Sequence, residues 1–345
     1  MGLGGISIKN SLADTSLETM QDKLLNLKKP FLKSFNPTVE SRKDRIRRII
    51  KLIEENSENI HKAISKDFGS RHEQLSQLTD TLSTVAHGKH VLKKINSWVK
   101  PDKRKARFPL NLLGSKALVH HQPYGVVGII SPWNFPVALS LGPLIEVFAA
   151  GNNAMMKLSE FVPETSKLMA DLVNKYFSED ELVIINGGTQ TSVDFTTLDF
   201  DHLLYTGSTA VGKKVCAAAA NNLVPVTMEL GRKSPVVVSN QSNLKKSVNQ
   251  IMTGKTVNAG QICVAPDYAF VPTESQDEFV SLARDFVKNS FPTIKNNPDY
   301  TSIIHLNHYD RLNALIEDAK NKGATVVELN PANEDFSQQE HHKIP

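Results

Sequence analysis

Hydrophobic positions in the first hundred residues follow the period of an α-helix. Between residues 41 and 68, isoleucines recur at steps of three and four: Ile46, Ile49, Ile50, Ile53, Ile60 and Ile64. Such spacing places them on one helix face and leaves the charged residues on the other. The arginines of this segment are followed by several glutamates, so we expect a solvated charged face rather than a phosphate-binding patch.

Residues 100–109, KPDKRKARFP, show neither a helical nor a strand period. The segment is basic and has a proline near each end, which is typical of a connection between structured parts. We therefore expect a connector here rather than a nucleic-acid-binding tail.

From Leu118 onward, short apolar runs alternate with amphipathic helical patterns. Continuous apolar runs are typical of strands buried on both faces, and their alternation with helices predicts an α/β fold with a parallel sheet. The predicted strands are VVGIIS, NAMMKLS, LVIING, HLLYTG and PVTMEL. Because ligands bind such sheets at the carboxyl ends of the strands, the turns that follow them are the informative positions.

A second α/β unit is predicted after Gly231, since a chain of 345 residues usually divides into two domains. Its expected elements are a strand in PVVVS, a helix over 244–258, a strand in APDYAFVP, a helix in SQDEFVSLARDFVKNSF, and a helix–strand pair that ends at Leu329.

Composition excludes several classes of protein. The net charge of +4 is too small to indicate a nucleic-acid partner, and two cysteines exclude a disulfide scaffold. The longest apolar stretch, 124–156, is interrupted by three prolines and Glu146, so no membrane span is expected. The N-terminus lacks a basic-then-apolar leader. These features favour a cytoplasmic protein.

The first turn that can carry chemistry is SPWNFP, residues 131–136. Pro132 and Pro136 bracket Asn134 and restrict the backbone around it. A rigidly held amide can donate a hydrogen bond to a developing oxyanion. A proline-rich corner whose asparagine satisfies its own turn explains the same residues, so both interpretations stay open.

The second turn is YTGSTAVG, residues 205–212. Gly207 ends a strand, and Ser208 and Thr209 open an alanine-rich helix whose free N–H groups and dipole favour a phosphate. The spacing is not GxGxxG, and Ser208 is also an ordinary N-cap residue.

The third turn, NAGQICVAP, presents Cys263 ahead of a strand. A thiol reacts only when its pKa is lowered or a base lies near it, and buried unreactive cysteines are commoner. Glu229 closes the strand PVTMEL beside a glycine, where a carboxylate can act as a general base. Cys216, inside a helical pattern, is given no role.

Taken together, SPWNFP, KLSE, TGSTAVG, ELGRKSP and GQIC resemble, in order and spacing, the motifs of the NAD(P)-dependent aldehyde dehydrogenase superfamily. KDFGSRHEQLSQLTD, LVPVTMEL and NAGQICVAPDY are similar to the coniferyl aldehyde dehydrogenase group within it. The resemblance extends from about Leu24 to the end of the chain.

The resemblance implies a catalytic set and a cofactor set. Cys263 would add to the aldehyde carbonyl, Asn134 would hold the oxyanion together with the Cys263 N–H, and Glu229 would activate the water that hydrolyses the thioester. The residues implied in cofactor binding are Trp133, Lys157, Glu160, Gly207, Ser208, Gly212 and Leu230. A carboxylate at position 160 suits a free 2′-hydroxyl, which favours NAD and leaves NADP as an alternative.

The resemblance also implies a domain scheme: a Rossmann-like cofactor domain over 1–106 and 123–230, an oligomerisation hairpin over 107–122, and a catalytic domain over 231–345. The family continues beyond Pro345, so we expect an incomplete catalytic domain, and a homodimer if the C-terminal tail is present. Two residues depart from the family pattern: Leu158 replaces a proline, and Arg232 replaces a glycine.

Three other functions stay open. The first is a catalytically impaired remnant that only binds a nucleotide, suggested by Arg232 and the length. The second is acyl transfer to coenzyme A, against which Glu229 argues because it favours hydrolysis. The third is a Cys–His hydrolase, although no histidine is tied to Cys263.

Overall fold

Two compact units make up the chain. The computed structural model describes residues 13–34, 36–231 and 233–345. Unit 1 contains the described residues up to Ser57 together with Thr79–Glu229, and unit 2 contains Glu58–Leu78 and Leu230–Pro345. The N-terminal residues considered for a leader and Arg232 lie outside the described residues. The domain boundaries expected from the sequence stay predictions.

A five-stranded sheet in the order β5-β4-β3-β6-β7 forms the centre of unit 1. β3 pairs in parallel with β4 and with β6, and β4 pairs in parallel with β5. The strands are β3 (Val126–Ile130), β4 (Asn153–Lys157), β5 (Leu182–Ile185), β6 (His202–Gly207) and β7 (Val226–Leu230). These are the five strands predicted from the apolar runs. The strand order reverses beside β3, which makes its carboxyl end a topological switch point.

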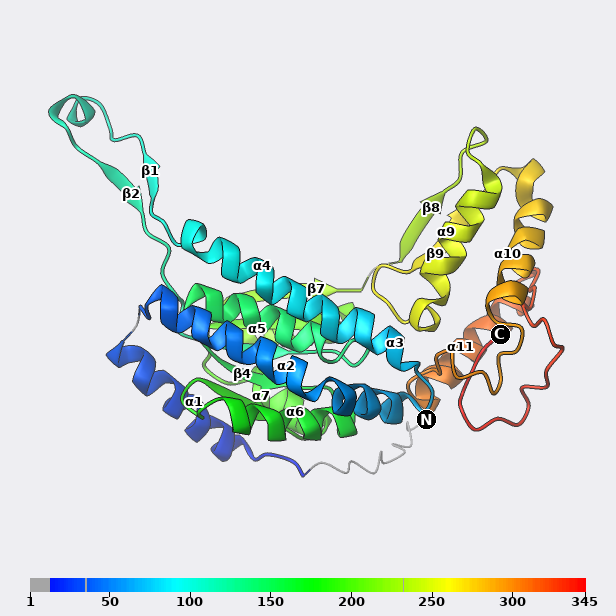
Figure 1. Ribbon diagram of the computed structural model, residues 1–345, viewed down its shortest axis with the longest axis horizontal. Coiled ribbons are helices and arrows are strands. Elements are labelled where there is room, and N and C mark those ends of the chain that lie inside the picture. Colours follow the sequence, from blue (N-terminus) through cyan, green and yellow to red (C-terminus); the bar gives the residue numbers. More distant parts are fainter. Residues whose placement is uncertain (1–12, 35, 232) are drawn as a thin grey trace. The chain divides into compact units, whose positions relative to one another are not determined.

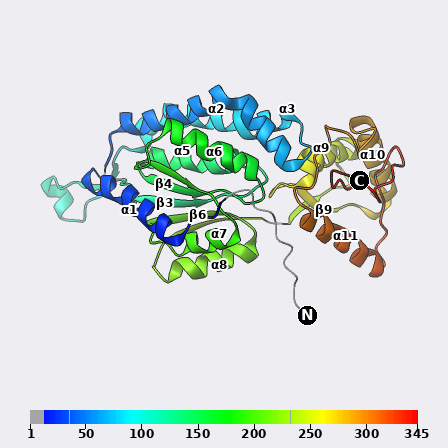
Figure 2. The ribbon, with the colours of Figure 1, turned by 90° about the horizontal axis from the view of Figure 1, so that it is seen from below.

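Helices cover both faces of this sheet (Figure 1). Figure 2 shows α5 and α6 on one face, with α2 outside them, and α7 and α8 on the other face. α1 contacts β4, β3 and α7, and α4 packs on α5. The helices are α1 (Leu17–Lys33), α2 (Val39–Phe68), α4 (Ser83–Trp98), α5 (Ala138–Ala150), α6 (Pro163–Tyr176), α7 (Thr189–Thr196) and α8 (Thr209–Ala220). Among the helices described, none combines the length and apolar character needed to cross a bilayer.

The predicted amphipathic helix is α2, which runs from unit 1 into unit 2. All six of its predicted core isoleucines are buried. A short α3 (Glu73–Ser76) and a π-helical turn, η1 (Gln77–Leu82), lie between α2 and α4. The helical period of the isoleucines therefore identified the buried face correctly.

The prediction that the arginines of α2 form a solvated face is wrong for three of the four. Arg42 is 4% exposed and donates from Nη1 to the carbonyl oxygen of Ala149 at 3.0 Å, in the last turn of α5. Arg45 and Arg48 are half-buried and bind the Glu181 carboxylate. The last carbonyls of a helix have no intrahelical donor, and an arginine that reaches one satisfies it.

We expect Glu181→Gln to lower the stability of unit 1 and to make that stability less dependent on pH in the acid range. Burial by itself raises the pKa of Glu181, but the hydrogen bonds and charges of Arg48 and Arg45 outweigh it and lower the pKa to about 2. The folded state thus binds its proton less readily than the unfolded state, whose pKa is 4.5. The stabilisation is complete above pH 4.5 and is lost as the pH falls towards 2.

The expected loss for Glu181→Gln is about 2 kcal/mol at neutral pH, measured by thermal melting between pH 3 and pH 7. Glu179→Gln is the matched control, because Glu179 binds Lys23 with a side chain that is 66% exposed, and exposed pairs contribute little. Parallel melting profiles for wild type and Glu181→Gln over this pH range would contradict the assignment.

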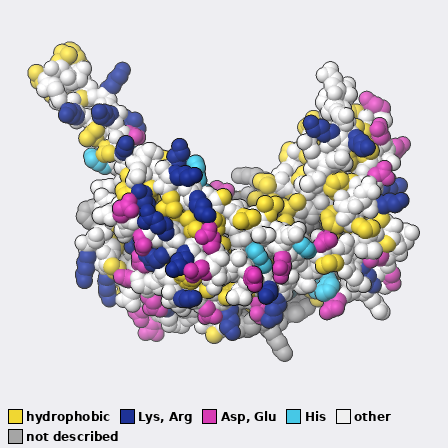
Figure 3. All heavy atoms as spheres, in the orientation of Figure 1, with side chains coloured by type: hydrophobic (Ala, Val, Ile, Leu, Met, Phe, Trp, Pro, Cys, Tyr) yellow, Lys and Arg dark blue, Asp and Glu magenta, His cyan; other side chains and the backbone are white. Residues whose placement is uncertain are grey.

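A hairpin projects from unit 1 between α4 and β3 (Figure 1). β1 (Asp102–Arg104) pairs antiparallel with β2 (Ala117–Val119), and η2 (Leu110–Leu113) forms a 3₁₀ turn at the tip. The prediction that 100–109 is only a connector is therefore partly wrong, because part of it forms β1. The residues that pair with β1 are more than ten positions away, and no local pattern reveals them. Phe108 and Leu113 are 73% and 79% exposed. Figure 3 shows hydrophobic side chains gathered at the tip of this projection. The oligomerisation role of 107–122 stays a prediction.

Unit 2 contains a two-stranded parallel sheet of β8 (Ser234–Val237) and β9 (Pro266–Phe270). α9 (Leu244–Thr256) contacts β9 and α10 (Gln276–Ser290). The remaining elements are η3 (Val257–Gly260), η4 (Thr273–Ser275) and α11 (Leu306–Asn321). The strand expected to end at Leu329 is wrong: residues 324–330 have no strand structure, and Val326 and Val327 are exposed instead of paired.

Candidate functional site

Three turns lie together at the carboxyl edge of the unit 1 sheet. Ile130, the last residue of β3, is in register with Lys157 of β4 and with Tyr205 of β6. The turns that follow these strands therefore begin side by side, at the topological switch point. They carry the predicted residues Trp133, Asn134, Lys157, Glu160, Gly207 and Ser208.

The turn over residues 131–136 is anchored at both ends. The Ser131 N–H donates to the carbonyl oxygen of Lys157 at 3.1 Å, which continues the ladder between β3 and β4. The Ser140 hydroxyl donates to the carbonyl oxygen of Pro136 at 2.6 Å. Trp133 and Asn134 lie between these anchors and are half-buried. A side-chain amide on such a fixed turn can hold a constant direction.

The turn after β4 places an ammonium group beside a carboxylate. The Lys157 side chain is 1% exposed, and its Nζ lies 4.0 Å from Glu160 Oε2 and donates to the carbonyl oxygen of Leu158 at 2.7 Å. Burial lowers the pKa of Lys157, and the charges of Glu160 and Asp14 oppose that shift. One donor and one acceptor at this spacing suit the two adjacent hydroxyls of a ribose. Leu158 is buried, so its side chain packs in the core.

Asp14 is a residue of this edge that the sequence did not indicate. Its Oδ1 accepts from the Gly188 N–H at 2.6 Å and from the Thr191 hydroxyl at 2.9 Å, at the start of α7. The hydrogen bond from Gly188 is the main reason that the pKa of Asp14 is lowered. The partners lie more than 170 positions away, and α7 itself was not predicted, so no local signal pointed to this contact.

The turn after β6 forms as predicted. Ser208 is the N-cap of α8, and its Oγ accepts from the Val211 N–H at 3.3 Å. A Cβ at Gly207 would meet the hydroxyl end of the Tyr205 ring, so a side chain at this position would require that ring to move. Gly212 is buried one turn into α8. An exposed helix start of this kind can receive a phosphate, although its hydrogen bonds are also those of an ordinary N-cap.

The residues present fit a dinucleotide at this edge. Ser131 Oγ and Asn186 Oδ1 are buried and have no hydrogen-bond partner among the described residues. They follow the carboxyl ends of β3 and β5. Buried polar atoms are normally satisfied, so two unsatisfied ones at the ligand edge are consistent with a polar ligand that pairs with them.

In unit 2, Cys263 follows a strained turn. Asn258, Ala259 and Gly260 have φ angles of 52°, 49° and 74°, a left-handed run that costs energy for the two non-glycine residues. Gln261 braces the turn, because its Nε2 donates to the carbonyl oxygen of Ser302 at 2.9 Å and its Oε1 accepts from Ile304 N–H. The Cys263 side chain is exposed. Backbone strain of this kind concentrates at functional sites.

The other predicted residues are divided between the two units. Glu229 is exposed on β7 and is the last residue of unit 1, and Leu230 is the first residue of this part of unit 2. Asn134 belongs to unit 1 and Cys263 to unit 2. The juxtaposition of thiol, amide and carboxylate is therefore a proposal.

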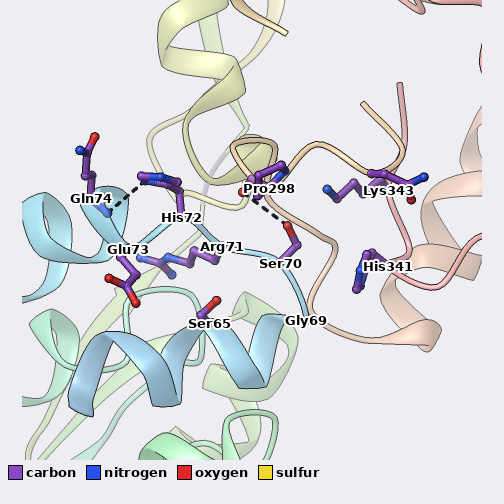
Figure 4. Close-up of a pocket in the computed structure, with 11 residues that line it drawn as sticks. Ser65, Gly69, Ser70, Arg71, His72, Glu73, Gln74, Pro298, His341 and Lys343 are labelled. Carbon is purple, nitrogen blue, oxygen red and sulfur yellow. Dashed lines mark hydrogen bonds between the residues drawn. The ribbon is translucent and has the colours of Figure 1, made fainter. Parts of the chain in front are cut away.

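A pocket of about 470 Å³ in unit 2 contains none of the predicted residues. Figure 4 shows Arg71, His72 and His341 among its lining side chains, together with Lys343. Lys343 Nζ donates to the carbonyl oxygen of Asn297, and burial lowers the pKa of Lys343 to about 8. His72 Nε2 lies 3.5 Å from Asp299 Oδ1. These polar contacts hold loops of unit 2 together, and we assign the pocket no catalytic role.

Comparison with known proteins agrees with this geometry. The profile of the aldehyde dehydrogenase family matches residues 27–341. A probable coniferyl aldehyde dehydrogenase of Caulobacter vibrioides is 47% identical over 97% of this chain and 70% of its own length. The coniferyl aldehyde dehydrogenase of a Pseudomonas species is 45% identical over 96% of this chain and 68% of its own length. Substrate-bound AldH of Staphylococcus aureus has a TM-score of 0.86 at 32% identity, covering 94% of this chain and 69% of that one.

Proposed function

The chain belongs to the aldehyde dehydrogenase family, and we propose that it oxidises aromatic aldehydes of the coniferyl type with NAD⁺ as the preferred cofactor. As a member of this family it is an NAD(P)-dependent oxidoreductase that converts an aldehyde to a carboxylic acid. The observation that carries the cofactor part is the set of three adjacent turns at the switch point of the unit 1 sheet. The substrate part rests on the two coniferyl aldehyde dehydrogenases named above.

The unit 1 residues would bind and orient the cofactor. Lys157 Nζ and the Glu160 carboxylate would hold the adenosine ribose hydroxyls, and the start of α8 at Ser208 would receive the pyrophosphate. Trp133 would form a wall of the cofactor cleft. Gly207 and Gly212, which have no side chain, would let the cofactor approach the backbone, and Leu230 would also contact it. When bound, the nicotinamide supplies the hydride acceptor.

The chemistry at the substrate would use three residues. Cys263 Sγ, as thiolate, would add to the aldehyde carbonyl, and Asn134 Nδ2 with the Cys263 N–H would donate to the oxyanion. Loss of hydride from the substrate carbon leaves a thioester on Sγ. The Glu229 carboxylate would then take a proton from a water molecule as that water attacks the thioester carbon, which releases the acid and regenerates the thiolate.

We expect Glu160→Gln to raise the KM for NAD⁺ by roughly tenfold and to narrow the preference for NAD⁺ over NADP⁺. The variant loses a charge-assisted acceptor for the ribose hydroxyls, which is worth roughly 1.5–3 kcal/mol. It also removes the repulsion between a carboxylate and a 2′-phosphate. Steady-state kinetics with both cofactors measure the change.

The matched control for Glu160→Gln is Glu164→Gln, four residues later in the first turn of α6. It removes the same charge from the neighbouring segment and should leave both KM values unchanged. Equal changes in the two variants would show that the effect is the net charge of the region and not a contact with ribose.

The proposed substrate is tested by following reduced nicotinamide with NAD⁺ and a panel of cinnamyl, benzyl and aliphatic aldehydes. We expect kcat/KM to be highest for the cinnamyl members, and a preference for aliphatic aldehydes would overturn the substrate class. Analysis of the product with and without coenzyme A separates hydrolysis from acyl transfer. Silence across the panel in a chain that still binds NAD⁺ would support the nucleotide-binding remnant instead.

A further inference from the structure

Asp80 is a fully buried carboxylate beside the turn that carries Asn134. Its side chain is 0% exposed, and it lies in the π-helical turn η1 between α3 and α4. A π-helical turn inside a helix commonly marks a functional position. The Thr84 hydroxyl donates to the Asp80 carbonyl oxygen at 2.6 Å, and the Thr79 hydroxyl donates to Oδ2 at 3.3 Å. The bond from Thr79 holds one carboxylate oxygen, and the bond from Thr84 holds the backbone of Asp80.

The carboxylate is directed at the first amides of α5. Asp80 Oδ1 accepts from the Val137 N–H at 3.0 Å and from the Ala138 N–H at 3.2 Å. Val137 is the N-cap of α5 and has no side chain that could cap the helix. The cap therefore comes from another element, 57 positions earlier in the chain. A negative charge at a helix start also interacts favourably with the helix dipole.

Val137 directly follows SPWNFP, so Asp80 fixes the end of the turn that carries Asn134. The other end is fixed by the bond between Ser131 and β4. Only Phe135 and Pro136 separate Asn134 from Val137, and Pro136 has a restricted φ. A shift of the first turn of α5 would consequently move the amide of Asn134.

Burial of an ionised carboxylate is costly unless the protein compensates it. Any of the usual N-cap side chains at position 137 would cap α5 without that cost. The chain instead places a charged acceptor between the turn and α4, where it holds two consecutive amides at once. This arrangement gives a stiffer anchor than a local cap, because both amides are fixed to a second element.

We propose that Asp80 is a positioning residue for aldehyde oxidation, which holds the 131–137 turn so that Asn134 Nδ2 stays directed at the developing oxyanion. This inference rests on the proposed role of Asn134. In this role Asp80 does not touch substrate or cofactor, and it acts through the amides of Val137 and Ala138.

The test uses Asp80→Asn, which keeps the shape and one acceptor oxygen but weakens the two charge-assisted bonds. We expect single-turnover formation of reduced nicotinamide to slow by roughly tenfold, and by roughly 10²-fold in Asp80→Ala. The Kd for NAD⁺ and the KM for aldehyde should stay within about twofold, because only the transition state uses the oxyanion contact. A fall in NAD⁺ affinity without slower single turnover would overturn the proposal.

Asp201→Asn is the matched control. Asp201 Oδ2 accepts from the Val126 N–H at 2.7 Å, so it is also a carboxylate that holds a backbone amide, but at the opposite end of β3 from the turn. We expect a similar drop in melting temperature and an unchanged single-turnover rate. Equal slowing in both variants would mean that Asp80 has only a structural role.

A double-mutant cycle separates failure of this inference from failure of the proposed function. If Asn134→Ala slows turnover and Asp80→Asn adds nothing in that background, Asp80 acts through Asn134. If Asn134→Ala slows turnover and Asp80→Asn alone does not, the positioning role is overturned and the role of Asn134 stands. If Asn134→Ala has no effect, the oxyanion role fails and the inference fails with it.

Hydrogen exchange keeps the inference testable in a chain that shows no turnover. The amides of Val137 and Ala138 should be protected in the wild type, and the 131–138 segment should exchange faster in Asp80→Asn but not in Asp201→Asn. Unchanged exchange in Asp80→Asn would show that the carboxylate does not hold the turn.

Discussion

Replacement of Cys263 by alanine is expected to abolish aldehyde oxidation, with a loss of at least roughly 10⁴-fold in kcat, and to leave NAD⁺ binding within about twofold. The reason is that the covalent route needs a nucleophile that forms the thiohemiacetal and then carries the acyl group, and an alanine side chain supplies none. All of the proposed cofactor residues except Leu230 belong to unit 1, whereas Cys263 belongs to unit 2, and the substitution changes none of them.

The measurement combines single-turnover formation of reduced nicotinamide with NAD⁺ titration by the quenching of Trp133, one of two tryptophans in the chain. Cys216→Ala is the matched control, because Cys216 is the other cysteine and lies on α8. We expect Cys216→Ala to keep full activity. Turnover that survives in Cys263→Ala would remove the covalent mechanism, and loss in both variants would point to oxidation or instability instead of chemistry.

The structure adds a physical reason for choosing Cys263 over Cys216. Cys263 is exposed after a left-handed run at Asn258, Ala259 and Gly260, which is braced by Gln261, whereas Cys216 is an ordinary helical residue. From the sequence alone, NAGQICVAP gave only a lone cysteine before a strand. The backbone strain that presents the thiol depends on Ser302 and Ile304, about 40 positions later, and no local pattern contains it.

Local patterns predicted the parts of the fold that are built locally. The apolar runs gave all five strands of the unit 1 sheet, and the isoleucine spacing gave the buried face of α2. Where the structure depends on distant partners, the predictions failed. Arg42 is buried because a helix end 107 positions away needs a donor, and β1 forms because β2 pairs with it.

The same division applies to the candidate site. The turns after β3 and β6 were recognised because proline, glycine and serine mark them directly in the sequence, whereas the turn after β4 was indicated only by the resemblance of KLSE to the family motif. Neither Asp14 nor Asp80 was given a role. Asp14 lies in no motif, Asp80 ends the stretch KDFGSRHEQLSQLTD without any chemical signal of its own, and their partners are 174 and 57 positions away. Both carboxylates bind backbone amides, which carry no sequence signal at all.

Glu229→Gln is expected to separate the two halves of the reaction. Thioester hydrolysis needs a base for the attacking water, and loss of a general base costs roughly 10²–10⁴-fold, whereas loss of hydride from the thiohemiacetal does not use this carboxylate. We therefore expect a burst of reduced nicotinamide close to one equivalent per Cys263, followed by a steady state that is slower by roughly 10²-fold. Glu179→Gln, which changes an exposed glutamate bound to Lys23, should show wild-type kinetics.

Hydroxylamine gives this prediction its sharpest test, because it attacks a thioester without needing a base on the enzyme. In Glu229→Gln it should restore much of the steady-state rate and yield the hydroxamate, because the acyl group remains bound to Cys263 as a thioester. If the burst and the steady state fall together and hydroxylamine restores neither, the thioester does not accumulate, and Glu229 acts before hydride loss, as the base that forms the Cys263 thiolate. If coenzyme A accelerates turnover of the wild type and an acyl-coenzyme A is the product, acyl transfer is instead the natural second step.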